Sequence, residues 1–436
     1  MAGRNASSFK FIFIFLGIIL VFIIAGLTIL DFKYKPAVDK FAFILRPSNI
    51  KQIENTKFPV KKLPIPNAFD YYNKAAKSLN PRGIEKSYSN KPANINSIDC
   101  FTLPIAEIKH SININQKAIS LLRNGLKYDY MSPSATFDDK FDYLDEYRDL
   151  IRLLRNESIL FESEGNYSKA IQNRIECIKF GVQIPKGGGV ILTLVGISCQ
   201  AIACNRIPSL LNNVDAKTAK SAIKQLIEID NSSVSLADII QDESNSTKLF
   251  IIKQMKSNKK MRDSDDSKNP ANPNGIAFLN KLYANGFLSI DDYCKKEKTE
   301  ANKPYPLRKK IETPTDYIGN IFSPSFDTLG FKFSFIETYR KLLILELALR
   351  AYYLDYKKYP DNLSQLCPKY LSKLPKDPFT VNEDFKYKKT GSDYIVYSIG
   401  PDFKDDNGKP FSKDSKEKKV MPKPDSKGDI LFGMTD

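Results

Sequence analysis

The chain has 436 residues, of which 42% are hydrophobic and 27% are charged, and it contains 28 Phe and 22 Tyr. This composition excludes a chain that is disordered throughout, because disordered segments contain few aromatic and apolar residues. Lys and Arg exceed Asp and Glu by 16. The basic residues are scattered along the chain and form no block, so binding to nucleic acid is not expected.

An uncharged run of twenty residues, Phe11–Leu30, lies close to the N-terminus. A helix of about twenty residues spans about 30 Å, the thickness of the hydrocarbon core of a bilayer. The run is too long for the apolar region of a cleavable signal peptide, and no A-x-A-like site follows it. Residues 1–31 are therefore expected to anchor the chain in the cytoplasmic (inner) membrane of a bacterium as a single transmembrane helix. The bulk of the chain would then be extracytoplasmic, in the periplasm.

The residues after the anchor divide into a stalk and a helical body. Residues 32–66 are rich in Pro, Lys and Asn, which favours a stalk. In residues 67–300, apolar residues recur three and four positions apart, which predicts helices. Charged and helix-breaking residues predict a mobile loop at 256–274. The expected helices lie at 67–79, 116–126, 136–154, 216–229 and 236–255 and around 278–283.

A helical hairpin is predicted for Asn156–Pro185, with a break at Gly165 and Asn166. This stretch resembles one tetratricopeptide-type unit, but no second clear copy follows, so it indicates helix-pair packing and does not establish a peptide-binding groove. Three glycines, Gly187–Gly189, then precede an apolar segment. Because no Lys-Ser or Lys-Thr follows them, they predict a turn into a buried helix and not a phosphate loop.

Motifs for catalysis are lacking in the sequence. It contains one histidine, His110, and no G-x-S-x-G, H-E-x-x-H or Walker motif. Carboxylates cluster between Asp138 and Asp149, where they could act as acid and base but also suit the first turns of a helix. The chain is not expected to be an enzyme. An envelope hydrolase that uses carboxylates of the helical body stays open as an alternative.

The C-terminal region, residues 301–436, is expected to form a small α+β module. A broad apolar stripe predicts a long helix over Ser334–Lys358, which ends before Pro360. Two alternating segments, Phe385–Lys389 and Tyr394–Ile399, predict an antiparallel hairpin around Gly391. The expected fold class is therefore mainly α, with one N-terminal transmembrane helix, a helical body and a C-terminal module made of a helix and a hairpin.

The module carries a series of short motifs that resembles the globular domain of the major (G-type) pseudopilin of type II secretion systems. In chain order the motifs are Tyr359-Pro360, Leu374-Pro375, Asp377-Pro378, Tyr397-Ser398, Gly400, Asp402 and Asp429-Ile430. The resemblance implies a calcium site at Asp402 and Asp429. Asp405 and Asp406 lie close by in the sequence, and carboxylate oxygens in a flexible loop suit Ca²⁺. A solvated Asp/Asn/Gly turn is the alternative interpretation of this loop.

Two features of the chain lie outside this resemblance. The apolar run contains no Glu, no cleavage motif of the pseudopilin type precedes it, and some three hundred residues separate it from the module. The sequence thus favours a membrane-anchored extracytoplasmic interaction or scaffold protein with unidentified protein partners, linked to type II secretion or to cell-envelope assembly. A binder of anionic polymer or lipid is a further alternative.

Overall fold

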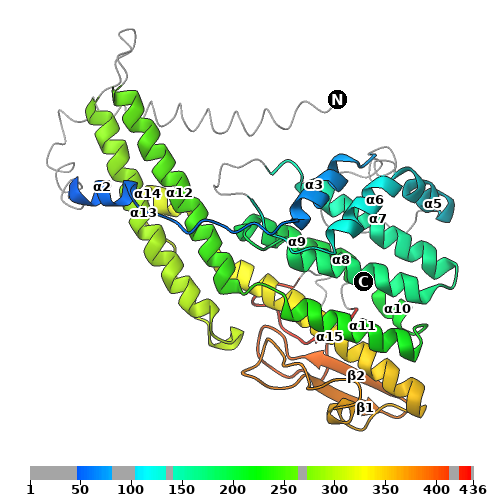
Figure 1. The fold of residues 1–436 in the computed structure, drawn as a ribbon. Helices are drawn as coiled ribbons and strands as arrows, with labels where there is room; N and C mark the ends of the chain where they lie inside the picture. Colours follow the sequence, from blue (N-terminus) through cyan, green and yellow to red (C-terminus); the bar gives the residue numbers. More distant parts are fainter. Residues whose placement is uncertain (1–46, 81–103, 134–140, 264–272, 412–421, 434–436) are drawn as a thin grey trace. The chain divides into compact units, whose positions relative to one another are not determined.

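The computed structural model describes residues 47–80, 104–133, 141–263, 273–411 and 422–433 (Figure 1). These residues are mainly helical and include one small antiparallel sheet, as the sequence predicts. The predicted anchor at Phe11–Leu30 and the first part of the predicted stalk lie outside the described residues. Within the described ranges, no helix is both long enough and apolar enough to cross a membrane.

The chain divides into two compact units, which are described separately. Of the described residues, the larger unit comprises 59–80, 104–133, 141–247, 292–313, 324–411 and 422–433, and the smaller unit comprises 47–58, 248–263, 273–291 and 314–323. The helices of the larger unit that precede residue 236 are α3 (Ala68–Lys77), α5 (Ile105–Ile114), α6 (Gln116–Gly125), α7 (Leu144–Ser163), α8 (Tyr167–Gln183), α9 (Gly189–Cys204), α10 (Ile207–Leu211) and α11 (Ala216–Asn231).

The remaining elements follow in chain order. Helices α12 (Leu236–Asp263) and α13 (Pro273–Ala301) each contribute residues to both units, and the smaller unit also contains α2 (Pro47–Glu54) and α14 (Tyr317–Phe322). The C-terminal elements of the larger unit are η1 (Tyr305–Leu307), α15 (Phe326–Tyr356), η2 (Leu363–Leu366), β1 (Lys386–Thr390), β2 (Asp393–Ser398) and β3 (Ile430–Leu431).

Several predicted helix boundaries are confirmed by capping side chains. Asn67 caps α3 by accepting a hydrogen bond from the amide of Phe69, and Asp215 caps α11 by accepting one from the amide of Thr218 at 2.8 Å. Helix α7 ends at Ser163, and Asn166 caps the start of α8. The predicted hairpin of helices at 156–185 is therefore confirmed.

Three predicted segments are wrong in their extent. The helix predicted at 136–154 is α7, which begins only at Leu144; residues 141–143 are not helical, and Thr136 lies outside the described residues. Part of the predicted stalk is the helix α2, which Pro47 begins, since the fixed φ of proline suits a first helical position. Part of the predicted loop at 256–274 is also helical, because Lys, Met and Arg are good helix formers.

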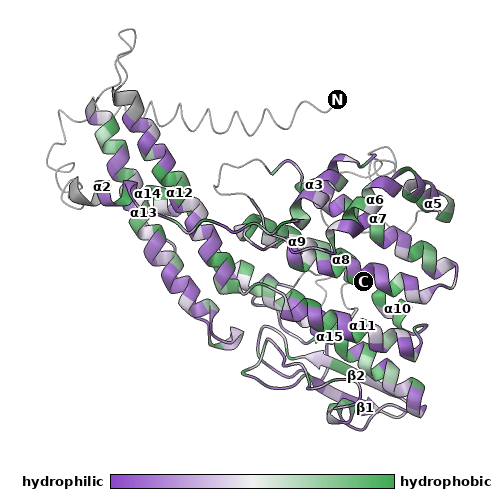
Figure 2. Ribbon diagram, in the orientation of Figure 1, coloured by the Kyte–Doolittle hydropathy of each residue, from purple (hydrophilic) through white to green (hydrophobic). Residues whose placement is uncertain are grey.

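Both α12 and α13 carry hydrophilic and hydrophobic residues along their length (Figure 2).

An aromatic core lies among α3, α6, α7 and α8. The ring of Tyr72 stacks against Tyr130 at 5.9 Å and lies 4.6 Å from the ring of Phe180, while Tyr147 approaches Phe180 edge-on at 5.2 Å. A side chain at Gly125 would collide with the Tyr72 ring, because an added Cβ would lie 2.5 Å from it. The close approach of α6 to α3 therefore depends on this glycine.

The glycine run at 187–189 leads into α9, as predicted. Gly189 has a φ of +61°, and a Cβ there would lie 2.3 Å from a carboxylate oxygen of Glu243. That carboxylate accepts a hydrogen bond from the amide of Val190 at 2.8 Å, so the chain itself places an anion at the N-terminus of α9. The N-terminus of α9 is thus occupied by Glu243.

Replacement of Glu243 by alanine is expected to lower the free energy of unfolding by about 1–2 kcal/mol, the usual loss for a removed helix cap. The variant Glu243→Gln keeps an acceptor oxygen, so its free energy of unfolding should fall by less than about half of that amount. Urea denaturation of the full chain measures both changes. Equal losses in the two variants would contradict the capping role, because they would depend on the charge alone.

Helix α15 lies between helices and a sheet. It contacts α11 and α9 of the helical body and, on another face, strand β2 (Figure 1). Strand β2 pairs antiparallel with β1, where Tyr387 is opposite Val396, and with β3, where Ser398 is opposite Ile430. The predicted hairpin is confirmed, and β3 completes the sheet. One hydrophobic core includes residues of α8, α9, α11, α15 and the sheet.

The smaller unit has its own apolar contacts. Phe250 of α12 lies against Phe322 of α14, with ring centroids 5.3 Å apart. A Cβ on Gly286 would lie 2.3 Å from the Ile318 side chain, so this glycine permits close packing of α13 and α14. Lys248 forms an ion pair with Asp291 at 2.5 Å between α12 and α13.

Candidate functional site

The predicted calcium ligands lie in the loop after β2 and just before β3. Asp429 is fully buried, and its two carboxylate oxygens accept hydrogen bonds from the amides of Gly408 at 2.6 Å and Asp406 at 3.3 Å. Burial raises the pKa of Asp429 to about 6, and the charges of Asp405 and Asp406 act in the same direction. The structure therefore brings three of the four predicted carboxylates, Asp405, Asp406 and Asp429, close enough to repel one another.

The other hydrogen bonds of this loop are made within the chain. Asp405 accepts hydrogen bonds from the hydroxyl of Tyr397 and from the amide of Asn407, both at 2.9 Å. Asp402 accepts one from the amide of Lys404 at 3.2 Å. In the part of the chain that the structure describes, no three His, Cys, Asp or Glu side chains are arranged as a metal site. Both oxygens of Asp429 and one oxygen each of Asp402 and Asp405 thus already accept hydrogen bonds from the chain, and calcium binding stays a prediction.

Two motifs that carry the pseudopilin resemblance contact each other. Asp377, from Asp-Pro, is 2% exposed and accepts hydrogen bonds from the hydroxyl of Ser398 at 2.7 Å and from the amide of Ile399 at 3.2 Å. The hydroxyl of Tyr387 donates to the carbonyl of Pro360 at 2.8 Å. These contacts tie the loops around the sheet to one another, which gives the motif residues a structural role.

Two of the carboxylates considered for a hydrolase, Asp145 and Asp149, are paired with arginines. Asp145 forms an ion pair with Arg148, and Asp149 forms one with Arg152 at 2.7 Å, all on α7. Burial raises the pKa of Asp149, and the hydrogen bond from Arg152 opposes that rise. Asp138 lies outside the described residues. Pairs three residues apart of this kind are common on helix surfaces, so these two carboxylates have a structural explanation.

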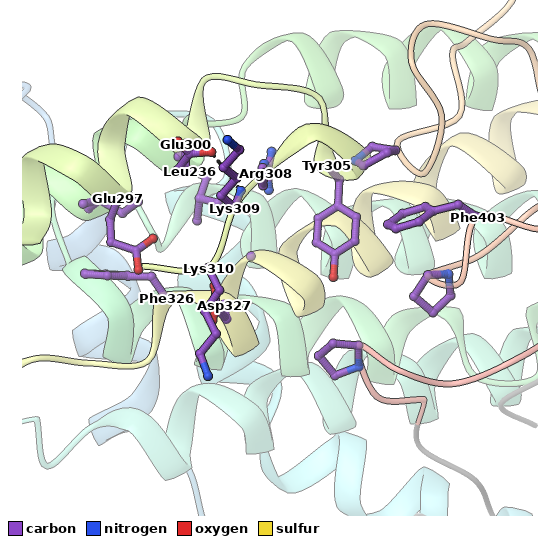
Figure 3. A pocket seen from close by; sticks show the side chains of 16 residues that line it. Leu236, Glu297, Glu300, Tyr305, Arg308, Lys309, Lys310, Phe326, Asp327 and Phe403 are labelled. Carbon is purple, nitrogen blue, oxygen red and sulfur yellow. Dashed lines mark hydrogen bonds between the residues drawn. The ribbon is translucent and has the colours of Figure 1, made fainter. Parts of the chain in front are cut away.

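Sequence reasoning missed a cavity of about 290 Å³ in the larger unit (Figure 3). Its walls come from the first turns of α12, the last turns of α13, the segment around η1, the first turn of α15 and two loops of the C-terminal region. Because six segments contribute, no local motif marks the cavity. Its lining includes Leu236, Glu297, Glu300, Tyr305, Arg308, Lys309, Lys310, Phe326, Asp327 and Phe403.

Glu297 forms the acidic side of this cavity together with Asp327. Glu297 is 5% exposed, and its Oε1 atom has no hydrogen-bond partner among the described residues. Burial and the neighbouring charge of Asp327 raise the pKa of Glu297 to about 7, against the effect of a hydrogen bond with Tyr293. The cavity therefore contains a buried carboxyl group with an unused oxygen.

Arg308 lies on the basic side of the cavity. Its Nε donates to the carbonyl of Lys303 at 3.0 Å, and its guanidinium lies 5.5 Å from the ring centroid of Tyr305. The Nη1 atom is buried and has no hydrogen-bond partner among the described residues. Burial lowers the pKa of Arg308, although the group stays charged at any ordinary pH.

The third acidic residue of the lining, Glu300, already has a partner for each of its carboxylate oxygens. One of its oxygens accepts a hydrogen bond from the amide of Lys309 at 2.8 Å, and the other pairs with Lys303 at 2.6 Å. These bonds hold the turn that follows α13 and thereby position Arg308. The groups with unused bonding capacity are thus Glu297 and Arg308, on different segments of the cavity wall (Figure 3).

Comparisons with protein-family models, with curated proteins and with solved structures find no match to this chain. Function is therefore inferred from the residues and the geometry of the chain.

Proposed function

We propose that the chain is a membrane-anchored interaction or scaffold protein, with its helical body and its pseudopilin-like C-terminal module outside the cytoplasm of a bacterial cell. The anchor is the apolar run Phe11–Leu30, and its length matches the hydrocarbon core of a bilayer. The process in which we propose that it acts is type II secretion or cell-envelope assembly.

The observation that carries this proposal is the shared core of the helical body and the C-terminal region. Helix α15 contacts α9 and α11 as well as β2, so the body and the sheet pack on the same helix. A fold of this kind presents helices on one part of its surface and loops around a sheet on another, which suits the binding of protein partners. The contact between Asp377 and Ser398 supports the family likeness, because it joins two of its motifs.

The test is fractionation of cells that express the full chain, with a variant lacking residues 11–30 beside it. We expect the full chain in the membrane pellet after alkaline carbonate treatment, and the variant in the supernatant. Protease added to spheroplasts should degrade the membrane-bound chain, because its bulk would face outward. A full chain that is released by carbonate, or that resists protease until the spheroplasts are lysed, would refute the proposal.

We also propose that the loop carrying Asp405, Asp406 and Asp429 binds Ca²⁺. Burial and the charges of Asp405 and Asp406 raise the pKa of Asp429, and a cation bound among the three carboxylates would offset this repulsion. If the affinity is in the millimolar range typical of extracellular modules, 5 mM Ca²⁺ should stabilise the full chain by about 1–2 kcal/mol.

Thermal melting in EDTA and in 5 mM Ca²⁺ tests this site. The variant Asp429→Asn should lose the calcium-dependent rise, whereas Asp425→Asn should keep it, because Asp425 is exposed and makes no part of the predicted set. The comparison uses the change on adding calcium, so a lower starting stability of Asp429→Asn does not affect it. An equal rise in both variants would show that calcium binds elsewhere.

A further inference from the structure

We propose that the cavity between α13, α15 and the segment around η1 binds a small zwitterion of amino-acid size, with its ammonium group at Glu297 and Asp327 and its carboxylate at Arg308. The cavity is independent of the membrane anchor and of the calcium loop. All of its lining belongs to the larger unit.

The acidic side calls for a positively charged donor. The unpartnered Oε1 atom of Glu297 is buried, and a buried polar atom without a partner costs about 1–3 kcal/mol. Asp327 lies near enough to raise the pKa of Glu297, so two carboxyl groups gather on this side. An ammonium group placed there would satisfy the open oxygen and offset the repulsion.

The basic side calls for an acceptor. The Nη1 atom of Arg308 is buried without a partner, and guanidinium groups bind carboxylates through short, charge-assisted hydrogen bonds. The side chains of Lys309 and Lys310 also line the cavity, and Lys310 lies beside Asp327 (Figure 3). A metabolite with only one charged group would leave either the acidic or the basic side unsatisfied.

Size and shape favour a small ligand with an apolar body. A volume of about 290 Å³ lies at the lower end of the range for small-molecule sites, which is about 300–1,000 Å³. Three aromatic residues, Phe326, Tyr305 and Phe403, belong to its lining, and the rings of Tyr305 and Phe403 lie side by side, with centroids 6.0 Å apart (Figure 3). An aromatic or branched amino acid combines these properties, whereas a polymer would not fit inside.

Isothermal titration calorimetry of the full chain, purified in detergent, tests the proposal with L-phenylalanine as the probe. Phenethylamine lacks its carboxylate, and 3-phenylpropanoate lacks its amine. We expect L-phenylalanine to bind with a Kd below about 1 mM and each analogue to bind at least about tenfold more weakly, because each loses one charge-assisted hydrogen bond. No saturable binding of L-phenylalanine, or equal binding of the analogues, would refute the proposal.

Two variants locate the charged groups of the ligand. Glu297→Gln should weaken L-phenylalanine binding about tenfold or more and leave 3-phenylpropanoate unchanged. Arg308→Gln should weaken L-phenylalanine and leave phenethylamine unchanged, and Arg308→Lys should recover part of the loss. The matched control is Lys296→Gln, which changes an exposed charge on α13 outside the cavity.

Circular dichroism melts of each variant show whether it folds. Because Arg308→Lys preserves the positive charge, it keeps the test valid if Arg308→Gln fails to fold. If both variants lose affinity for all three ligands to the same extent, the assignment of the two charged sides is wrong. The assignment is also wrong if Lys296→Gln loses as much affinity for L-phenylalanine as Glu297→Gln does.

Discussion

Replacement of Arg340 by leucine is expected to lower the free energy of unfolding by about 3 kcal/mol. Arg340 is 3% exposed on α15 and joins this helix to two helices of the body. It donates to Gln200 of α9 at 2.6 Å and pairs with Asp230 of α11 at 2.9 Å. Leucine would fill the space, but Gln200 and Asp230 would each lose the partner that offsets their desolvation.

Urea denaturation of the full chain, followed by circular dichroism, measures this loss. The control is Lys296→Gln on α13, because Lys296 is exposed and pairs with Asp292 of the same helix, at 2.6 Å. Such a pair contributes about 0.5 kcal/mol or less, so the control should be nearly neutral. Adding Asp230→Ala to Arg340→Leu should cost less than the sum of the two single changes, since both remove one interaction. Full additivity would contradict a direct pair.

The position of Arg340 matters because α15 is shared between the helical body and the C-terminal region. Leu342, Leu345 and Leu349 are fully buried, as are Leu343 and Leu347 of the predicted stripe. A helix buried on opposite faces is hydrophobic nearly all round, which its sequence also shows. An isolated fragment that begins at Ala301 would expose the face that α9 and α11 cover, so we expect it to aggregate.

Local sequence signals predict the helices well where one side chain defines a boundary. Asn67 and Asp215 cap the helices that follow them, and Gly165, with a φ of +73°, ends the hairpin turn that was expected there. In each case the cause is local, since a cap or a positive φ involves residues within three or four positions. The same holds for Gly391 in the turn between β1 and β2.

Long-range partners explain what the sequence does not predict. Strand β3 has two residues, too few for any alternation to be visible, and it exists because Ile430 pairs with Ser398 of β2. The cavity is even harder to predict from the sequence, because Glu297 and Arg308 belong to different segments and neither lies in a motif. Of the predicted calcium ligands, Asp402 and Asp405 each accept a hydrogen bond from the amide two residues later, as in the Asp/Asn/Gly turn that is the alternative interpretation of this loop.

The second large effect expected is a fall in stability between pH 5 and pH 8. Burial raises the pKa of Glu297 to about 7, and it raises the pKa of Glu346 to about 7 against the effect of the hydrogen bond from Tyr394. In the unfolded chain both carboxyls would titrate near 4.5. Between these values the folded chain binds more protons than the unfolded chain, so stability is full below pH 4.5 and decreases as the pH rises through 7. Each group should contribute about 2–3 kcal/mol to this decrease.

Groups with lowered pKa values act outside this window. Asp355 and Asp361 accept hydrogen bonds from lysines, which holds their pKa values below the usual range, so their contributions are lost only at more acidic pH. Denaturation by urea at pH 5.5, 6.5, 7.5 and 8.5 therefore reports the two glutamates together with Asp429, whose pKa is raised to about 6. We expect the free energy of unfolding to decrease between pH 5.5 and pH 7.5 and to level off by pH 8.5, where all three groups are ionised in both states.

Neutral variants of the two glutamates test the cause. Glu346→Gln retains an oxygen that can accept from the Tyr394 hydroxyl, and Glu297→Gln removes the charge facing Asp327, so each should flatten the pH dependence by about 2–3 kcal/mol. Glu383→Gln is the control, because Glu383 is 62% exposed and pairs with Lys386 at the surface. If the wild type is equally stable at pH 5.5 and 8.5, the two carboxyls are ionised in the folded chain, and the acidic side of the cavity would then carry a full negative charge before any ligand enters it.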